Sequence, residues 1–184
     1  MSIKILASKK GGAGGPKLIA SSVDPTAAAS LALSGLLGNT DIIYEVLARL
    51  VKDGTAGRIS LRCNADSGGN YNWTAQGFIN AAVGYTGGQL DTSLGLMNTD
   101  SPSLINPNDY FDCRLILFAK SGYKRRVISH AVTFAQRSGT PLIESYYAAG
   151  EWTNTANELT SITFVSSAGN IGGTGTFIRA YAIY

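Results

Sequence analysis

Hydrophobic and polar residues alternate over short stretches of the chain, and clusters of Gly, Asn, Asp, Pro and Ser separate these stretches. In "LTSITFV", residues 159–165, every second side chain shares a face and β-branched or aromatic residues dominate, which is typical of a strand. The separating clusters are typical of turns. The pattern predicts strands at residues 17–22, 27–33, 58–63, 93–97, 114–119, 127–134, 142–148, 159–165 and 176–183. These are enough for two packed sheets, so we expect an all-β fold.

The last two predicted strands flank a glycine-rich segment, "SSAGNIGGTG". In the closing stretch, Phe177, Arg179, Tyr181 and Ile183 alternate with the residues between them, as in a strand packed on both faces. A glycine-rich turn between two such stretches predicts that they pair as a hairpin.

Residues 41–54, "DIIYEVLARLVKDG", fit a helix as well as a strand. Their aliphatic residues at positions 42, 43, 46, 47, 50 and 51 would share one helical face, with Asp41 and Gly54 as caps. The alternation expected of a strand is poor in this segment. Taken alone, the pattern favours a helix.

The composition suits an all-β domain with many turns. Of 184 residues, 22 are Gly, 45% of the chain is hydrophobic and only 15% is charged. The length fits one domain. The formal net charge of +3 is too small and too scattered for a nucleic-acid-binding protein. No apolar run approaches the length of a membrane span and the first residues lack an apolar signal region, so we expect synthesis in the cytoplasm, with no membrane partner and no specific nucleic acid.

The N-terminal stretch "IKILASKKGGAGGPK", residues 3–17, resembles the start of a phosphate-binding loop. Such a loop needs Lys followed by Ser or Thr where this chain has Gly15 and Pro16, and proline supplies neither an N–H donor nor a hydroxyl. We therefore expect no nucleotide or other cofactor. We interpret residues 1–16 as a flexible arm ahead of a domain at 17–184. Residues 3–6 would pair with the sheet edge of a neighbouring chain, and residues 11–15 would carry the bend.

Few residues have the spacing that is typical of a metal site or a catalytic group. Cys63 and Cys113 are the two cysteines, and no His or further Cys lies at metal-ligand spacing from them, so we expect no metal site. Buried free thiols and a disulfide both fit their apolar surroundings, with free thiols favoured. His130 is the single histidine and lies in a predicted strand, which favours a structural role over Ser–His catalysis.

Two acidic groups are candidates for a site. Glu144 and Glu151 could be the paired carboxylates of a glycoside hydrolase, although nothing in the sequence marks a cleft between them. Asp100, Asp109 and Asp112 could bind Ca²⁺ in the loop "NTDSPSLINPNDYFD", but their spacing is irregular and a solvated loop is favoured. We therefore expect no catalytic residues.

The C-terminal stretch "GEWTNTANELTSITFVSSAGNIGGTGTFIRAYAIY" resembles the end of a β-sandwich domain common among virion proteins of tailed bacteriophages. The segments "KLIASSV", "AASLALSGL", "YEVLARLV", "GRISLRCNADSGGNY" and "DCRLILFAK" match the front of that domain more loosely. The resemblance covers residues 17–184 and departs at the closing strand, where "FIRAYAIY" replaces the more usual Leu-Tyr-Gly-Ile ending. It implies a strand at 42–51 and an antiparallel jelly-roll-like β-sandwich that assembles symmetrically, often as a trimer, on a capsid or tail.

On this resemblance we expect a non-enzymatic virion structural protein of a phage, made in the host cytoplasm. A capsid decoration or cement protein that binds the major capsid protein and stabilises its lattice is favoured. The alternative is a tail- or fibre-associated head that binds a receptor or glycan, and an enzyme is the weakest option. Copy number separates the first two, since decoration requires hundreds of copies per particle. The residues expected to make the interactions are Ile3, Ile5, Leu6, Lys9, Lys10, Lys124, Arg125 and Arg126.

The basic stretch "KSGYKRRV", residues 120–127, would touch acidic capsid protein or would form a solvated hairpin tip. The aromatic residues Tyr71, Trp73, Tyr85 and Trp152 could stack on sugar rings if they shared an exposed face, and core or subunit-interface packing is the favoured alternative.

Overall fold

The computed structural model describes residues 15–41, 43–79, 82–97, 105–137 and 140–183. Most of the expected N-terminal arm therefore lies outside the described residues, including Ile3, Ile5, Leu6, Lys9 and Lys10. The described ranges form thirteen strands: β1 Lys17–Val23, β2 Ser30–Ser34, β3 Ile43–Asp53, β4 Ile59–Cys63, β5 Tyr71–Ile79, β6 Ala82–Asp91, β7 Leu94–Gly95, β8 Tyr110–Phe118, β9 Arg125–Arg137, β10 Thr140–Trp152, β11 Ser161–Ser166, β12 Asn170–Ile171 and β13 Phe177–Ile183.

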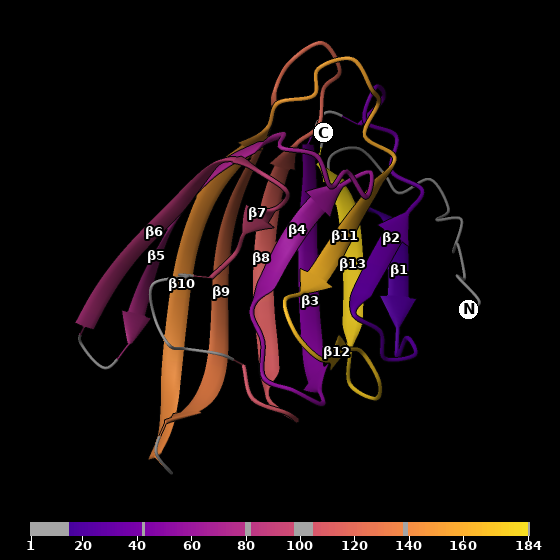
Figure 1. Ribbon diagram of the computed structural model, residues 1–184. Coiled ribbons are helices and arrows are strands. Elements are labelled where there is room, and N and C mark those ends of the chain that lie inside the picture. Colours follow the sequence, from indigo (N-terminus) through magenta and orange to yellow (C-terminus); the bar gives the residue numbers. More distant parts are fainter. Residues whose placement is uncertain (1–14, 42, 80–81, 98–104, 138–139, 184) are drawn as a thin grey trace.

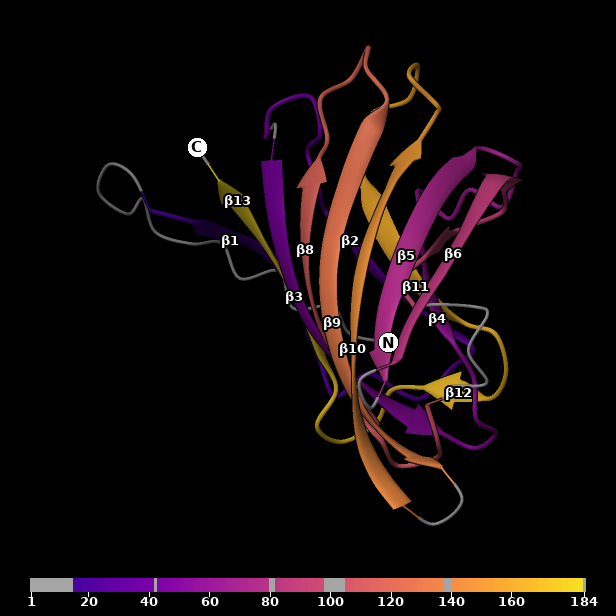
Figure 2. The same cartoon turned by 90° about the vertical axis from the view of Figure 1, so that its left-hand side faces the viewer.

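The strands form two antiparallel sheets packed together, which confirms the all-β sandwich (Figure 1). The large sheet has nine strands in the order β1-β13-β3-β8-β9-β10-β5-β6, with β12 also paired to β3. The small sheet has four, in the order β2-β11-β4-β7. Strands β9 and β10, each 13 residues long, extend as a hairpin beyond the ends of their neighbours (Figures 1 and 2). Within the described ranges, no helix is long and apolar enough to cross a membrane.

The core lies between the sheets, and β3 shows how the sequence fills it. Tyr44, Val46, Ala48 and Leu50 are buried, and the residues between them lie on the opposite face. The strand interpretation of this segment is therefore confirmed. Its alternation is weak in the sequence because the opposite face carries aliphatic residues too, such as Leu47.

The predicted hairpin between the last two strands is wrong. β11 pairs with β2 and β4 in the small sheet, whereas β13 lies between β1 and β3 in the large sheet. The glycine-rich segment is thus a crossover between sheets, and it contributes β12 to the edge of β3. Gly169, Gly172, Gly173 and Gly175 all have positive φ angles there, which side chains with a Cβ rarely adopt.

A buried lysine fixes the crossover to the large sheet. Lys52 is 1% exposed, and its Nζ donates hydrogen bonds to the carbonyl oxygens of Ala168 and Asn170. Burial lowers the pKa of this ammonium group. The two carbonyls supply the partners that a buried cation needs.

Strands β5 and β6 are absent from the sequence prediction. They continue the large sheet beyond β10, with Ala75 opposite Ala148 and Gln76 opposite Tyr85. Their many Gly, Asn and Thr residues are typical of loops, which explains the omission. The alternation of buried Tyr71 with polar Asn72 is the pattern that could have revealed β5.

Candidate functional site

The large sheet has one face against the small sheet and one face toward solvent, which we call the outer face. Side chains of the outer face alternate with the buried core positions along each strand. Large apolar and aromatic groups are frequent among them. Those that are more than a third exposed are Val23, Phe78, Val83, Tyr85, Tyr110, Phe118, Ile128, Ile143 and Tyr147.

Strand register brings aromatic side chains together near the middle of the outer face. His130 on β9 lies opposite Tyr147 on β10, and their rings stack with centroids 4.5 Å apart at 9°. The Phe78 ring meets Tyr147 edge-on, with centroids 5.9 Å apart. The His130 ring thus packs against an aromatic neighbour.

Charged residues on the outer face pair with one another. Arg49 on β3 makes two hydrogen bonds to the carboxylate of Asp112 on β8, at 2.7 and 2.9 Å. Arg114 on β8 donates to Glu45 on β3 at 2.6 Å. These bonds hold opposite charges side by side, and the carboxylate of Asp112 raises the pKa of Arg49. Each of these two pairs is therefore neutral as a whole.

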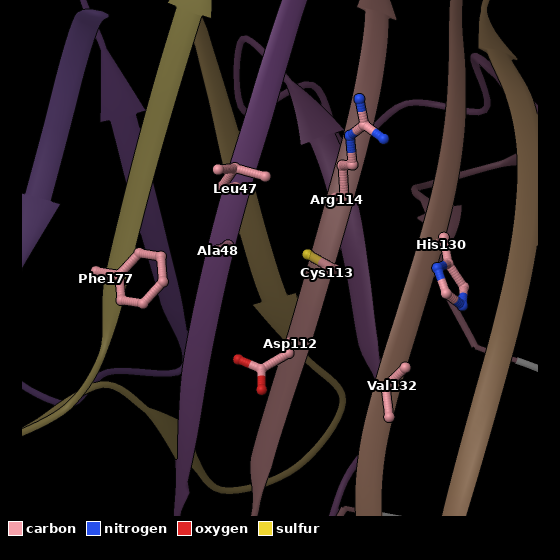
Figure 3. Close-up of a pocket in the computed structure, with 8 residues that line it drawn as sticks. All are labelled: Leu47, Ala48, Asp112, Cys113, Arg114, His130, Val132 and Phe177. Atoms are coloured by element: carbon pink, nitrogen blue, oxygen red, sulfur yellow. The ribbon is translucent and has the colours of Figure 1, made fainter.

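A shallow depression of about 320 Å³ lies between these ion pairs. Figure 3 shows its wall residues on four strands, with Phe177 on β13, Leu47 on β3, and His130 and Val132 on β9. Asp112 and Arg114 of the two ion pairs complete the wall, and the small core residues Ala48 and Cys113 also line it. The depression is of a size to receive an apolar side chain from another molecule.

The candidate carboxylates do not form a catalytic pair. Glu144 is fully buried in the core, where it accepts a hydrogen bond from the Tyr146 hydroxyl. Glu151 lies on the outer face and accepts from Lys124 at 2.7 Å and from Asn72 at 3.0 Å. Residues 144 and 151 are an odd number of positions apart, so strand alternation sends their side chains to opposite faces of β10. They cannot flank one glycosidic bond.

The candidate calcium loop is only partly described. Asp100 lies outside the described residues, and the carboxylate of Asp112 forms an ion pair with Arg49. The backbone carbonyl of Asp109 accepts a hydrogen bond from the Lys52 amide. Among the described residues, no three His, Cys, Asp or Glu side chains lie together in a way that could hold a metal ion.

The basic turn between β8 and β9 forms a cavity at one end of the outer face. The cavity measures about 540 Å³ and is lined by Phe118, Lys120, Tyr123, Lys124 and Arg126. Phe118 and Arg126 lie directly opposite each other in the β8–β9 register. The Lys120 ammonium lies 5.5 Å from the centre of the Tyr123 ring. Lys124 and Arg126 thus lie on the surface, as an interaction role requires.

Arg125 does not share this surface, contrary to its place among the expected interaction residues. It is fully buried, and its guanidinium donates to the carbonyls of Asn154 and Asn157 and lies 5.3 Å from the centre of the Trp152 ring. Residues 125 and 126 are neighbours on a strand, so their side chains point to opposite faces. Arg125 is therefore a structural residue.

Trp152 connects Arg125 to the turn before β5. Its Nε1 donates to the Asp66 carboxylate at 2.7 Å, and the same carboxylate accepts from the Gly68 amide and the Asn70 side chain. These hydrogen bonds lower the pKa of Asp66. The segment "ADSGGNY", residues 65–71, is thus tied to the end of β10.

A second cavity of about 360 Å³ adjoins the first, and Arg126 lines both. Its other polar residues are Asn72 and Thr74 on β5, Gln89 on β6 and Glu151 on β10. The sequence did not predict this cavity because two of its four strands, β5 and β6, were not predicted.

Most of the candidate sugar-stacking aromatics belong to the core. Tyr71, Trp73 and Trp152 are at most 9% exposed, whereas Tyr85 on β6 is 65% exposed. Core packing is therefore confirmed for the first three.

Both cysteines are free and buried, as expected. Burial raises the pKa of the Cys63 thiol to about 12 and also raises that of Cys113. Since the thiolate is the reactive form, neither residue is a nucleophile near neutral pH.

Comparisons with protein-family models, curated proteins and solved structures found no match for this chain.

Proposed function

We propose that this chain is a non-enzymatic structural protein of a phage virion, in the first place a capsid decoration or cement protein. Its jelly-roll-like body would associate with further copies of itself, as a trimer according to the family resemblance, and bind the major capsid protein. The observation that supports an assembly role is the outer face of the large sheet, where apolar and aromatic side chains are widely exposed.

The chemistry of the outer face fits a second copy of the chain as its partner. Monomeric proteins rarely leave a broad apolar surface in water, because covering it is favourable. Arg49 and Arg114 are already paired with carboxylates of their own chain, so these two cations add little like-charge repulsion when two copies meet. The depression beside Leu47 offers a place for a side chain of the other copy.

Self-association can be tested by light scattering after size-exclusion chromatography of the full chain. We expect an oligomer at micromolar concentration, and we expect Ile128→Asp to dissociate it because this change places a charge in the apolar face. Leu37→Asp is the matched control, since Leu37 is 52% exposed in a loop away from the outer face. A monomeric wild type, or an Ile128→Asp variant that still assembles, would contradict the proposal.

The position on the particle needs a separate measurement. Quantitative mass spectrometry of intact virions gives the copy number of this chain relative to the major capsid protein. We expect hundreds of copies for a decoration protein. A handful of copies would instead support the tail- or fibre-associated receptor or glycan-binding head, and absence from the virion would overturn both.

A further inference from the structure

The two cavities that meet at Arg126 form one composite surface site, which we call the Arg126 groove. Its first part, between Phe118 and Tyr123, has a volume of about 540 Å³, and its second part, beside β5 and β6, about 360 Å³. Arg126 lines both parts. A ligand longer than one small ring could therefore contact both parts at once.

The first part of the groove is cationic and aromatic. Lys120, Lys124 and Arg126 line it, and one nearby carboxylate, Glu151, is held by Lys124 at 2.7 Å. Glu151 balances the charge of one of the three cations, so this part of the groove has a net positive charge. Tyr123 is 64% exposed, and its ring, with the Lys120 ammonium 5.5 Å from the ring centre, is an apolar surface on which a ligand could pack. This combination suits a flat, partly apolar group that carries a negative charge.

The second part of the groove is polar and hydrogen-bonding. Gln89 lines it with an amide, and the Thr74 hydroxyl, which donates to the Thr86 carbonyl at 3.2 Å, has lone pairs left to accept from a ligand. Glu151 is held in place by Lys124 and Asn72, and a carboxylate with two such donors has lone pairs left for further donors. Closely spaced hydroxyl groups on a ligand would find both donors and acceptors here.

We propose that the Arg126 groove binds an acidic oligosaccharide. The Arg126 guanidinium pairs with a sugar carboxylate, the Tyr123 ring packs against the C–H face of a pyranose ring, and Thr74, Gln89 and Glu151 bond hydroxyl groups of the next residue. The inference goes beyond the proposed assembly function and does not depend on it.

An acidic peptide fits the groove less well. Strands β8, β9 and β10, beneath the first part of the groove, are each paired on both sides, so a peptide strand could bond only to the edge strand β6, beside the second part and away from Lys120 and Tyr123. A nucleic acid fits less well too, since neutralising a run of phosphates requires several free cations and Lys124 is already paired with Glu151.

Isothermal titration calorimetry of the full chain tests the proposal with three probes: trigalacturonic acid, the neutral trisaccharide with the same linkage, and triglutamate. We expect trigalacturonic acid to bind, and the neutral sugar to bind at least about tenfold more weakly because it lacks the carboxylates that Arg126 pairs with. Binding of the neutral sugar as tightly as the acidic one would overturn the proposal. Tighter binding of triglutamate would assign the groove to an acidic peptide instead. No binding of trigalacturonic acid up to millimolar concentration would also overturn it.

Two variants locate the binding. Arg126→Met should weaken binding of trigalacturonic acid by about tenfold or more, and Tyr123→Ala should weaken both sugars. Arg179→Met removes the same charge elsewhere on the outer face, where Arg179 lies 5.1 Å from the Phe177 ring centre, and should leave the affinity unchanged. An equal loss in Arg179→Met would show general charge attraction and would refute the groove. The sugar affinity is measured separately from the copy number and the oligomeric state, which test the proposed function, so either proposal can fail without the other.

Discussion

Arg125 and Arg126 are neighbours in the sequence with opposite roles, which makes a sharp test of the fold. Replacing Arg125 with Met keeps much of the apolar stem but removes the guanidinium. Two hydrogen bonds to the carbonyls of Asn154 and Asn157 are lost, together with the contact to the Trp152 ring. Replacing Arg126 with Met removes the same charge from an exposed side chain.

The size of the effect follows from these contacts. A hydrogen bond from a charged donor contributes about 1.5–3 kcal/mol net, so two contribute about 3–6 kcal/mol. The variant also avoids the cost of burying a cation. This saving offsets part of the 3–6 kcal/mol, roughly 1–2 kcal/mol, because the net value of each hydrogen bond already includes most of the desolvation cost. We therefore expect Arg125→Met to lower the free energy of unfolding by about 2–4 kcal/mol. Arg126→Met should change it by no more than about 0.5 kcal/mol, as is usual for exposed positions.

Urea unfolding at one fixed protein concentration measures both variants, because association would otherwise shift the midpoints. Tryptophan fluorescence is a suitable signal since both tryptophans, Trp73 and Trp152, are buried. The slope with urea should stay the same for wild type and variants. A loss below about 1 kcal/mol in Arg125→Met, or equal losses in the two variants, would refute the assignment of Arg125 to the structure and Arg126 to the surface.

Three further predictions follow from buried groups. Burial raises the pKa values of Cys63, Cys113, Tyr44 and Tyr71, in the case of Cys63 to about 12 from an ordinary 9.0. The unfolded chain therefore loses these protons first, so the contribution of these four groups to stability should be constant below about pH 9 and fall as the pH rises from about 9 to 12, by up to about 1.4 kcal/mol per pH unit for each group. Urea midpoints that stay level up to about pH 11 would contradict this. Ellman's reagent should label neither thiol in the native protein and both in denaturant, and rapid labelling without denaturant would be the contrary result. Gly95→Ala should lower stability by about 1–3 kcal/mol, seen as a lower Tm, since the new Cβ would lie 2.6 Å from the Trp73 ring; an unchanged Tm would show that the ring can move aside.

Local patterns in the sequence predicted most strands but not their partners. Every predicted strand overlaps an observed one, because alternation and turn residues act over a few positions. The strand at 159–165 nevertheless joins a different sheet from the strand at 176–183. Pairing depends on which elements pack together in the whole fold, and a glycine-rich segment permits a crossover as readily as a turn. The antiparallel sandwich was thus predictable, and its strand order was not.

One part of the candidate site could also be predicted from the sequence, and the other part could not. The basic turn at 120–126 is visible in the sequence, and strand alternation from buried Val127 could have separated Arg125 from Arg126. The second part of the groove could not be predicted, since it exists only because β5 lies beside β10, with Thr74 opposite Ala149. Those residues are far apart in the chain, and no local pattern connects them.

The position of β13 between β1 and β3 has a consequence for synthesis. Lys17 lies opposite Ala182, so among the described strands β1 has no partner in the large sheet until β13 has left the ribosome. A chain that stops before Phe177 lacks an inner strand and leaves the edge of β3 open to pairing with other chains. Only chains that extend through β13 can therefore complete the large sheet, and chains that stop earlier should be removed by aggregation or proteolysis before they reach any assembly.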